Sequence, residues 1–159
     1  MWASEPVPFD PMEVALHDAY KKNTERDRRP DFHMAHEYPL GGKPPMMTHV
    51  FANDAGERII ACKGAPERVL QQSSLSDGEK TAVLAQVETL AGQGLRVLGV
   101  AEAQLAGNAY PKDQEEFTLD FLGLVFFLSI LASIVLYALV RGFVAWIDRN
   151  SPMTRADRR

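Results

Sequence analysis

The sequence predicts an α/β domain in which helices pack on a mostly antiparallel sheet. Two apolar runs, residues 46–51 and 58–62, flank an Asn-Asp-Ala-Gly turn and therefore predict a β-hairpin. Two further apolar runs, residues 95–101 and 117–125, are long enough to add strands to this hairpin. Three segments carry helix-start signals, and they are residues 11–22, 66–72 and 77–91.

The first and third helices are preceded by side chains that can cap a helix. Asp10 is suited to the N-cap of the first helix, Pro11 fits its first turn, and Glu13 can close a capping box. Ser76 and Glu79 form the same pattern before the third helix. These local signals predict where both helices begin.

Composition favours one folded domain with additional residues, in a chain of 159 residues with a net charge of −4. No basic stripe with interleaved aromatic residues occurs, so we expect no nucleic-acid partner. Cys62 is the single cysteine and cannot form an internal disulfide. His33 and His36 are three residues apart, but no further Cys/His pair has ligand spacing. We therefore expect a solvated loop there and no metal site.

The stretch Cys-Lys-Gly-Ala-Pro-Glu at residues 62–67 joins the second strand of the hairpin to the second helix. Pro66 is suited to the first position of a helix, which places Lys63 at the end of a strand before a tight turn. A cation beside the N–H groups of a helix start suits an anionic ligand such as phosphate. On geometry alone, an ordinary strand–turn–helix with a surface lysine is the alternative.

The same stretch resembles the Lys-Gly-Ala-Pro-Glu signature of the nucleotide-binding (N) domain of P-type cation-transporting ATPases. Residues 9–16, Phe-Asp-Pro-Met-Glu-Val-Ala-Leu, resemble the Asp-Pro-x-Glu-x-Ala-Leu motif of that domain. The Gly-Leu-Arg-Val-Leu run at residues 94–98 and the strand at residues 117–125 also look like this family. The resemblance implies the N-domain fold of a calcium or other cation pump, truncated and joined to an unrelated apolar tail.

The resemblance also implies a site for ATP, bound together with Mg²⁺. Its residues are Glu13, Leu40, Lys63, Gly64 and Arg96. In the family the lysine lines the ATP pocket, the glutamate faces the adenine, and the arginine contacts phosphate. From the residues alone, Glu13 serves only as a helix cap and Arg96 closes a salt bridge.

Two positions depart from the common pattern of the family. Alignment on Met47 places Leu40 where the family has an aromatic residue that stacks on adenine, and Pro45 where it has a lysine. Leu40 can cover a purine face, but it lacks an aromatic stacking contribution of about 1 kcal/mol. Tyr38 would substitute if strand alternation turned it the same way as Leu40. The departures predict weak nucleotide binding.

The C-terminal part of the chain predicts a membrane span. Residues 121–140 contain no charged side chain, which is about enough to cross a bilayer as a helix. We expect a domain at residues 1–125, a transmembrane helix at 126–147 and a basic tail at 148–159. A buried core helix is the alternative. The basic tail favours a cytoplasmic C-terminus, whereas the family resemblance predicts a cytoplasmic nucleotide-binding domain on the other flank.

The sequence contains neither the aspartyl-phosphate motif Asp-Lys-Thr-Gly-Thr nor a Walker-type loop. We therefore expect no catalytic residue and no turnover from this chain alone. The sequence predicts an ATP-binding module of a P-type cation-transporting ATPase, with nucleotide, membrane and the remaining domains of a pump as partners. The alternative is a membrane-tethered interaction protein, or a vestigial one, that no longer binds nucleotide.

Overall fold

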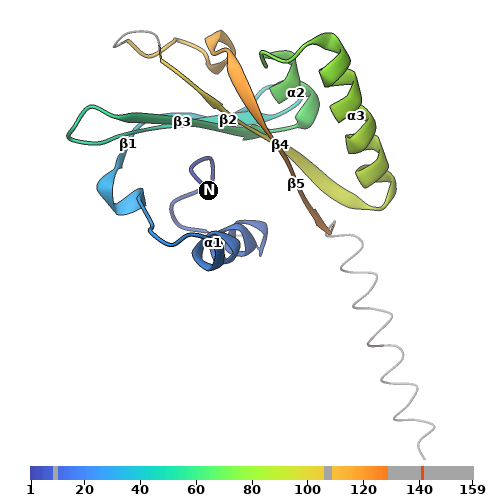
Figure 1. The fold of residues 1–159 in the computed structure, drawn as a ribbon, viewed down its shortest axis with the longest axis horizontal. Coiled ribbons are helices and arrows are strands. Elements are labelled where there is room, and N and C mark those ends of the chain that lie inside the picture. Colours follow the sequence, from blue (N-terminus) through green and yellow to red (C-terminus); the bar gives the residue numbers. More distant parts are fainter. Residues whose placement is uncertain (9–10, 106–108, 129–140, 142–159) are drawn as a thin grey trace, which may run out of the picture.

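The structure is a computed structural model that describes residues 1–8, 11–105, 109–128 and 141. Within these residues, five strands form one sheet in the order β1-β2-β3-β4-β5 (Figure 1). All neighbouring strands are antiparallel. The strands are β1 (His33–Gly41), β2 (Met46–Ala52), β3 (Arg58–Gly64), β4 (Leu95–Ala103) and β5 (Leu119–Leu128). The helices are α1 (Pro11–Asn23), α2 (Pro66–Gln71) and α3 (Asp77–Gly92), with short 3₁₀ helices η1 (Arg29–Asp31) and η2 (Gln114–Glu116).

The predicted fold class and the predicted hairpin are confirmed. Met46 pairs with Gly64 and Ala52 pairs with Arg58, so β2 and β3 are in register along their whole length. A side chain of the connecting turn stabilises it, because Asn53 Oδ1 accepts a hydrogen bond from the backbone N–H of Glu57 at 2.8 Å. Gly56 has a φ of 80°, a conformation that glycine adopts without steric cost.

All three predicted helices are confirmed within a residue or so of their expected ends. Ser76 and Glu79 form the predicted capping box, in which the Glu79 carboxylate accepts from the Ser76 N–H at 2.9 Å. Asp10, the predicted cap of α1, lies outside the described residues. Glu13 is buried in the first turn of α1, and its carboxylate is paired with Lys63.

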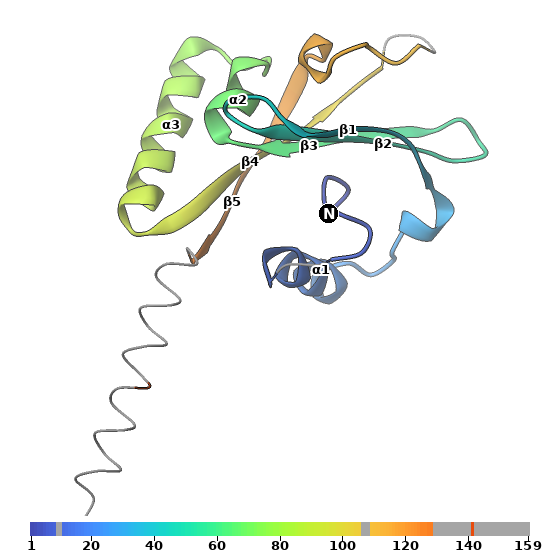
Figure 2. The same ribbon diagram turned by 180° about the vertical axis from the view of Figure 1, so that it is seen from behind.

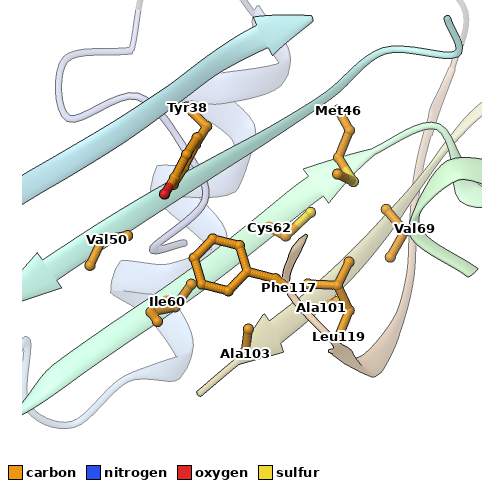
Figure 3. Close-up of a cluster of buried hydrophobic side chains, with 10 residues drawn as sticks. All are labelled: Tyr38, Met46, Val50, Ile60, Cys62, Val69, Ala101, Ala103, Phe117 and Leu119. Atoms are coloured by element: carbon orange, nitrogen blue, oxygen red, sulfur yellow. The ribbon is translucent and has the colours of Figure 1, made fainter. Parts of the chain in front are cut away.

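The hydrophobic core lies on one face of the sheet (Figure 3). Its strand residues alternate with residues that point to the opposite face, as the period of two in a β-strand requires. The segment around η2 covers this face, where Phe117 and Leu119 pack against β2 to β4, and α2 contributes Val69. The core cluster is Tyr38, Met46, Val50, Ile60, Cys62, Val69, Ala101, Ala103, Phe117 and Leu119.

The N-terminal segment and α1 lie over the opposite face of β1 to β3, and α3 lies beside β4 (Figures 1 and 2). Contacts of two histidine side chains help to hold the N-terminal segment there. A ring nitrogen of His49 contacts the carbonyl oxygen of Trp2 at 3.2 Å, and His17 contacts the carbonyl oxygen of Glu5 at 3.0 Å. This second face therefore carries polar side chains that are nevertheless shielded from solvent.

The loop predicted around His33 and His36 is wrong, because both residues belong to β1. His36 is half-buried, and its ring stacks on Tyr110 with a centroid separation of 5.1 Å. Residues 33–41 contain Pro39 and no Val, Ile or Thr, so they lack the usual composition of a strand. β1 is an edge strand, where a proline is tolerated.

β5 continues to Leu128, so Phe126 and the two residues after it lie in the sheet and not in the expected helix. The remainder of the predicted span at residues 126–147 falls outside the described residues, except for Arg141. None of the described helices is both long and apolar enough to cross a membrane.

Candidate functional site

A cavity of about 550 Å³ opens where α1, α3 and strands β1 to β4 come together. Part of its wall is apolar, with Met12, Met47, Val87 and Leu98 among the lining residues. Charged side chains also line it, and they are Glu5, Glu13, Lys63, Glu67 and Arg96. Apolar walls with a few convergent charged groups, in a volume of this size, are typical of small-molecule sites.

The structure brings together all five residues that the family resemblance implied. Four elements supply them: α1, β1, β3 and β4. The five residues that line the one cavity are Glu13, Leu40, Lys63, Gly64 and Arg96. Their role in binding stays a prediction, because lining a cavity does not identify its ligand.

Lys63 is placed by the alternation of β3. Its neighbour Cys62 points into the core, so the Lys63 side chain leaves the opposite face of the sheet. The following residue must be a glycine, because a Cβ on Gly64 would lie 2.7 Å from both Met46 Cα and the carbonyl oxygen of Pro45. The close approach of two backbones at Gly64 thus fixes the position from which Lys63 enters the cavity.

Lys63 and Glu13 form a buried ion pair in the cavity wall. Lys63 Nζ donates to Glu13 Oε1, with 10% of the lysine side chain and 3% of the glutamate side chain exposed. The pair joins α1 to β3 across 50 positions of sequence. Because each charge offsets the other, removal of one partner would deprive the remaining buried charge of its nearest opposite charge.

Leu40 and Tyr38 occupy different environments. Leu40 lines the cavity and is 65% exposed, whereas Tyr38 is buried in the core on the other face. The Tyr38 hydroxyl donates to the carbonyl oxygen of Pro111 at 2.6 Å. The interpretation that Tyr38 replaces the missing aromatic residue is therefore wrong. Burial is also the main cause that raises the pKa of the Tyr38 hydroxyl.

Arg96 lies near the start of β4, exposed and at the cavity wall. Within the described part of the chain Arg96 takes part in no salt bridge. The alternative expectation, that Arg96 closes a salt bridge, is therefore not met among these residues. An exposed guanidinium at the edge of a cavity is available to an anionic ligand.

Sequence reasoning gave no role in the site to Glu5, Met12 or Val87, although all three line the cavity. Val87 could have been found as an apolar residue of the third predicted helix, because its position one helical turn from Val83 and Leu90 gives that helix an apolar stripe. Glu5 gave no signal, because its place depends on how the N-terminal segment crosses the sheet. Cys62 is no candidate, since burial raises the pKa of its thiol to about 11 and the thiol faces the core.

Comparison with known proteins identifies the family. The family described as P-type ATPase, cytoplasmic domain N, matches residues 9–128. The chain is 33% identical over 140 residues to the sodium/potassium exporting P-type ATPase cta3 of Schizosaccharomyces pombe, a match that covers 75% of this chain and 13% of that protein. It is 31% identical over 128 residues to a calcium-transporting ATPase of Bacillus subtilis, which covers 72% of this chain and 14% of that protein.

The chain thus matches only about one seventh of the length of these curated relatives. Its five-stranded antiparallel sheet agrees with the fold that the resemblance implied. The family match covers residues 9–128, which include every element from α1 to β5. The chain therefore belongs to the family of P-type ATPase cytoplasmic N domains.

Proposed function

We propose that this chain is the ATP-binding module of a P-type cation-transporting ATPase. The module acts on the cytoplasmic side of a membrane, and other parts of a pump supply phosphoryl transfer and ion transport. The observation that carries the proposal is the convergence of Glu13, Lys63 and Arg96 from three elements on one cavity of about 550 Å³.

The cavity offers different chemistry to the two ends of a nucleotide. Apolar side chains such as Leu40 and Met47 can cover a purine ring, and the Glu13 carboxylate can accept a hydrogen bond from an exocyclic amine. Lys63 and Arg96 are the cations for the phosphates. Because Leu40 is aliphatic, the purine receives apolar cover without the aromatic stacking contribution.

The buried ion pair sets a cost on nucleotide binding. ATP must replace Glu13 as the partner of Lys63, so the gain from a lysine–phosphate contact is reduced by the loss of the lysine–carboxylate contact. The same exchange releases the Glu13 carboxylate toward the adenine. We therefore expect weak affinity, with the ion pair closed in the absence of nucleotide.

Mg²⁺ fits the charge balance of this cavity. The carboxylates of Glu5, Glu13 and Glu67 line the same walls as the two cations, so the walls do not carry an excess of positive charge. The triphosphate of ATP is strongly anionic. A Mg²⁺ ion bound to the phosphates would lower the charge that Lys63 and Arg96 must neutralise.

Calorimetry on the full chain tests the proposal, with MgATP and adenosine as ligands. The variant Arg96→Gln removes an exposed cation from the cavity wall without disturbing the core. We expect it to weaken MgATP binding roughly three- to tenfold, because the contact is charge-assisted but partly solvated. Adenosine, which has no phosphate, should bind the variant and the parent equally.

Arg26→Gln is the matched control, since Arg26 is exposed and pairs with Asp31 away from the cavity. Equal loss of MgATP affinity in both arginine variants would show non-specific charge attraction and contradict the proposal. A parent chain without measurable MgATP binding at millimolar concentration would favour the vestigial or interaction role.

A further inference from the structure

His49 is buried on the polar face of the sheet with one ring nitrogen unsatisfied. The side chain is 0% exposed in the middle of β2. Its Nδ1 atom lies 3.2 Å from the carbonyl oxygen of Trp2. Among the described residues, its Nε2 atom has no hydrogen-bond partner.

Two carboxylates converge on the same histidine. One ring nitrogen of His49 and one carboxylate oxygen from each of Glu5 and Glu37 lie within 4.8 Å of one another. Glu37 stands directly opposite His49 in the register of β1 and β2. Glu5 reaches the group from the N-terminal segment, where its backbone carbonyl contacts His17 of α1 at 3.0 Å. Three separate segments thus contribute one ligand-type atom each.

The hydrogen-bonding roles of these atoms suit a cation among them. A carbonyl oxygen only accepts, so Nδ1 must carry the proton that is shared with Trp2. In the neutral ring Nε2 then presents a lone pair, and ionised carboxylates also present only lone pairs. His49 is buried, Glu5 is half-buried and Glu37 is exposed, so a metal ion bound among them would have one fixed buried ligand and two ligands that solvent can reach.

We propose that Glu5, Glu37 and His49 form a binding site for one divalent metal ion of the zinc class. One imidazole nitrogen and two carboxylate oxygens are a ligand set that Zn²⁺ accepts, with a water molecule in the fourth position. The two carboxylates balance the charge of the ion, and the neutral imidazole adds none. The metal site shares Glu5 with the cavity proposed for nucleotide, but its argument does not rest on the nucleotide function.

The geometry requires a small closure of the ligands. Zinc–nitrogen and zinc–oxygen bonds are about 2.0–2.2 Å long, so two ligand atoms of one tetrahedral ion lie about 3.5 Å apart. Glu37 is exposed and Glu5 is half-buried, and both side chains can rotate inward while His49 stays fixed in β2. The ion would tie the N-terminal segment to β1 and β2.

Zinc titration of the metal-depleted full chain, without nucleotide, tests the proposal by calorimetry. We expect the parent to bind one Zn²⁺ ion per chain and Glu37→Gln to bind it at least about tenfold more weakly. Glu37 is exposed, so this variant should fold as the parent does. Glu5→Gln should show a similar loss. The matched control is Glu88→Gln, an exposed residue on α3, which should leave the affinity unchanged.

Long-range ¹H–¹⁵N correlation spectra of the histidine rings provide a second readout. Zinc should move the Nε2 resonance of His49 in the parent, and Glu37→Gln should need a higher zinc concentration for the same change. Unchanged zinc affinity in Glu37→Gln, or no zinc binding by the parent at micromolar concentration, would overturn the site. A zinc response confined to His33 or His36 would also overturn it, because the ion would then be held elsewhere.

Discussion

The two faces of the sheet are built by the same strands, yet they carry different chemistry. On the core face, β2 and β3 present Val50 and Cys62, and the buried hydroxyl of Thr48 is satisfied by Gln114 at 3.0 Å. The neighbours of these residues in the same strands, His49 and Lys63, lie on the other face and are also buried. The core face stabilises the fold by apolar packing, whereas the face that carries His49 and Lys63 holds polar groups that require specific partners.

The difference between the faces indicates which of them can bind a ligand. On the core face, one apolar side chain can replace another of similar volume at a modest cost in stability. On the second face, the Lys63–Glu13 pair depends on α1 being in place, and His49 depends on the N-terminal segment. A ligand that offers a better partner can compete for such groups.

Removal of one charge from the buried ion pair should have the largest effect. Lys63→Met takes the lysine charge away from the buried Glu13 carboxylate, which costs about 3–5 kcal/mol of unfolding free energy. Urea denaturation followed by circular dichroism measures this loss. The double variant Glu13→Gln with Lys63→Met removes both charges and should recover most of it. A single variant within about 1 kcal/mol of the parent would mean that the pair is solvated.

Shortening a side chain on the core face should lower the stability of the fold without changing the cavity. Leu119 is 0% exposed, and Leu119→Ala should cost about 3 kcal/mol through lost apolar burial and a residual void. Since Leu119 does not line the cavity, the folded fraction should bind MgATP with the affinity of the parent. Calorimetry at low temperature, where the variant is still folded, checks this independence. If the MgATP affinity of the folded variant fell together with its unfolding free energy, packing on the core face and binding in the cavity would be coupled.

Cys62 should give the core face a pH dependence at alkaline pH. Burial raises the pKa of its thiol from 9.0 to about 11, so the native state keeps a proton that the unfolded state releases. Stability from this group is therefore complete below about pH 9 and is lost as the pH rises toward 11, by about 1–3 kcal/mol. Cys62→Ala removes this dependence. Unfolding curves with the same alkaline slope in both proteins would refute the assignment.

An aromatic residue at position 40 should improve nucleotide binding modestly. Leu40 is 65% exposed at the cavity, so Leu40→Phe can add a stacking surface without repacking the core. We expect about 1 kcal/mol, or roughly fivefold, in MgATP affinity and no change in stability. Leu84→Phe on the exposed surface of α3 is the control. An equal gain from both variants would indicate non-specific binding to exposed aromatic rings.

Local signals explain how much of the fold could be predicted from sequence. Ser76 with Glu79, and the turn that ends at Gly56, act within a few residues, so both elements are confirmed near their expected ends. β1 was missed because residues 33–41 become a strand only by pairing with β2. Tyr38 was misplaced for a related reason, since a register shift between Tyr38 and Gly41 disturbs simple alternation.

The candidate sites depended on contacts across long stretches of sequence. Nothing local joins Glu13 to Lys63, and only the family resemblance assigned both to one site before the cavity was described. The group of Glu5, Glu37 and His49 has no regular spacing, so a search for Cys/His pairs could not find it. The three residues come together only because the folded N-terminal segment lies over β1 and β2 (Figure 1).

The central claim is that the polar face around Lys63, and not the core face, is the nucleotide site. Titration of the ¹⁵N-labelled full chain with MgATP, followed by backbone amide shifts, tests it most directly. We predict that saturable shifts cluster at cavity residues such as Leu40, Gly64 and Arg96, and that Val50 and Phe117 on the core face stay unchanged. Shifts centred on the core face, or no saturable shift in the cavity residues, would contradict the account.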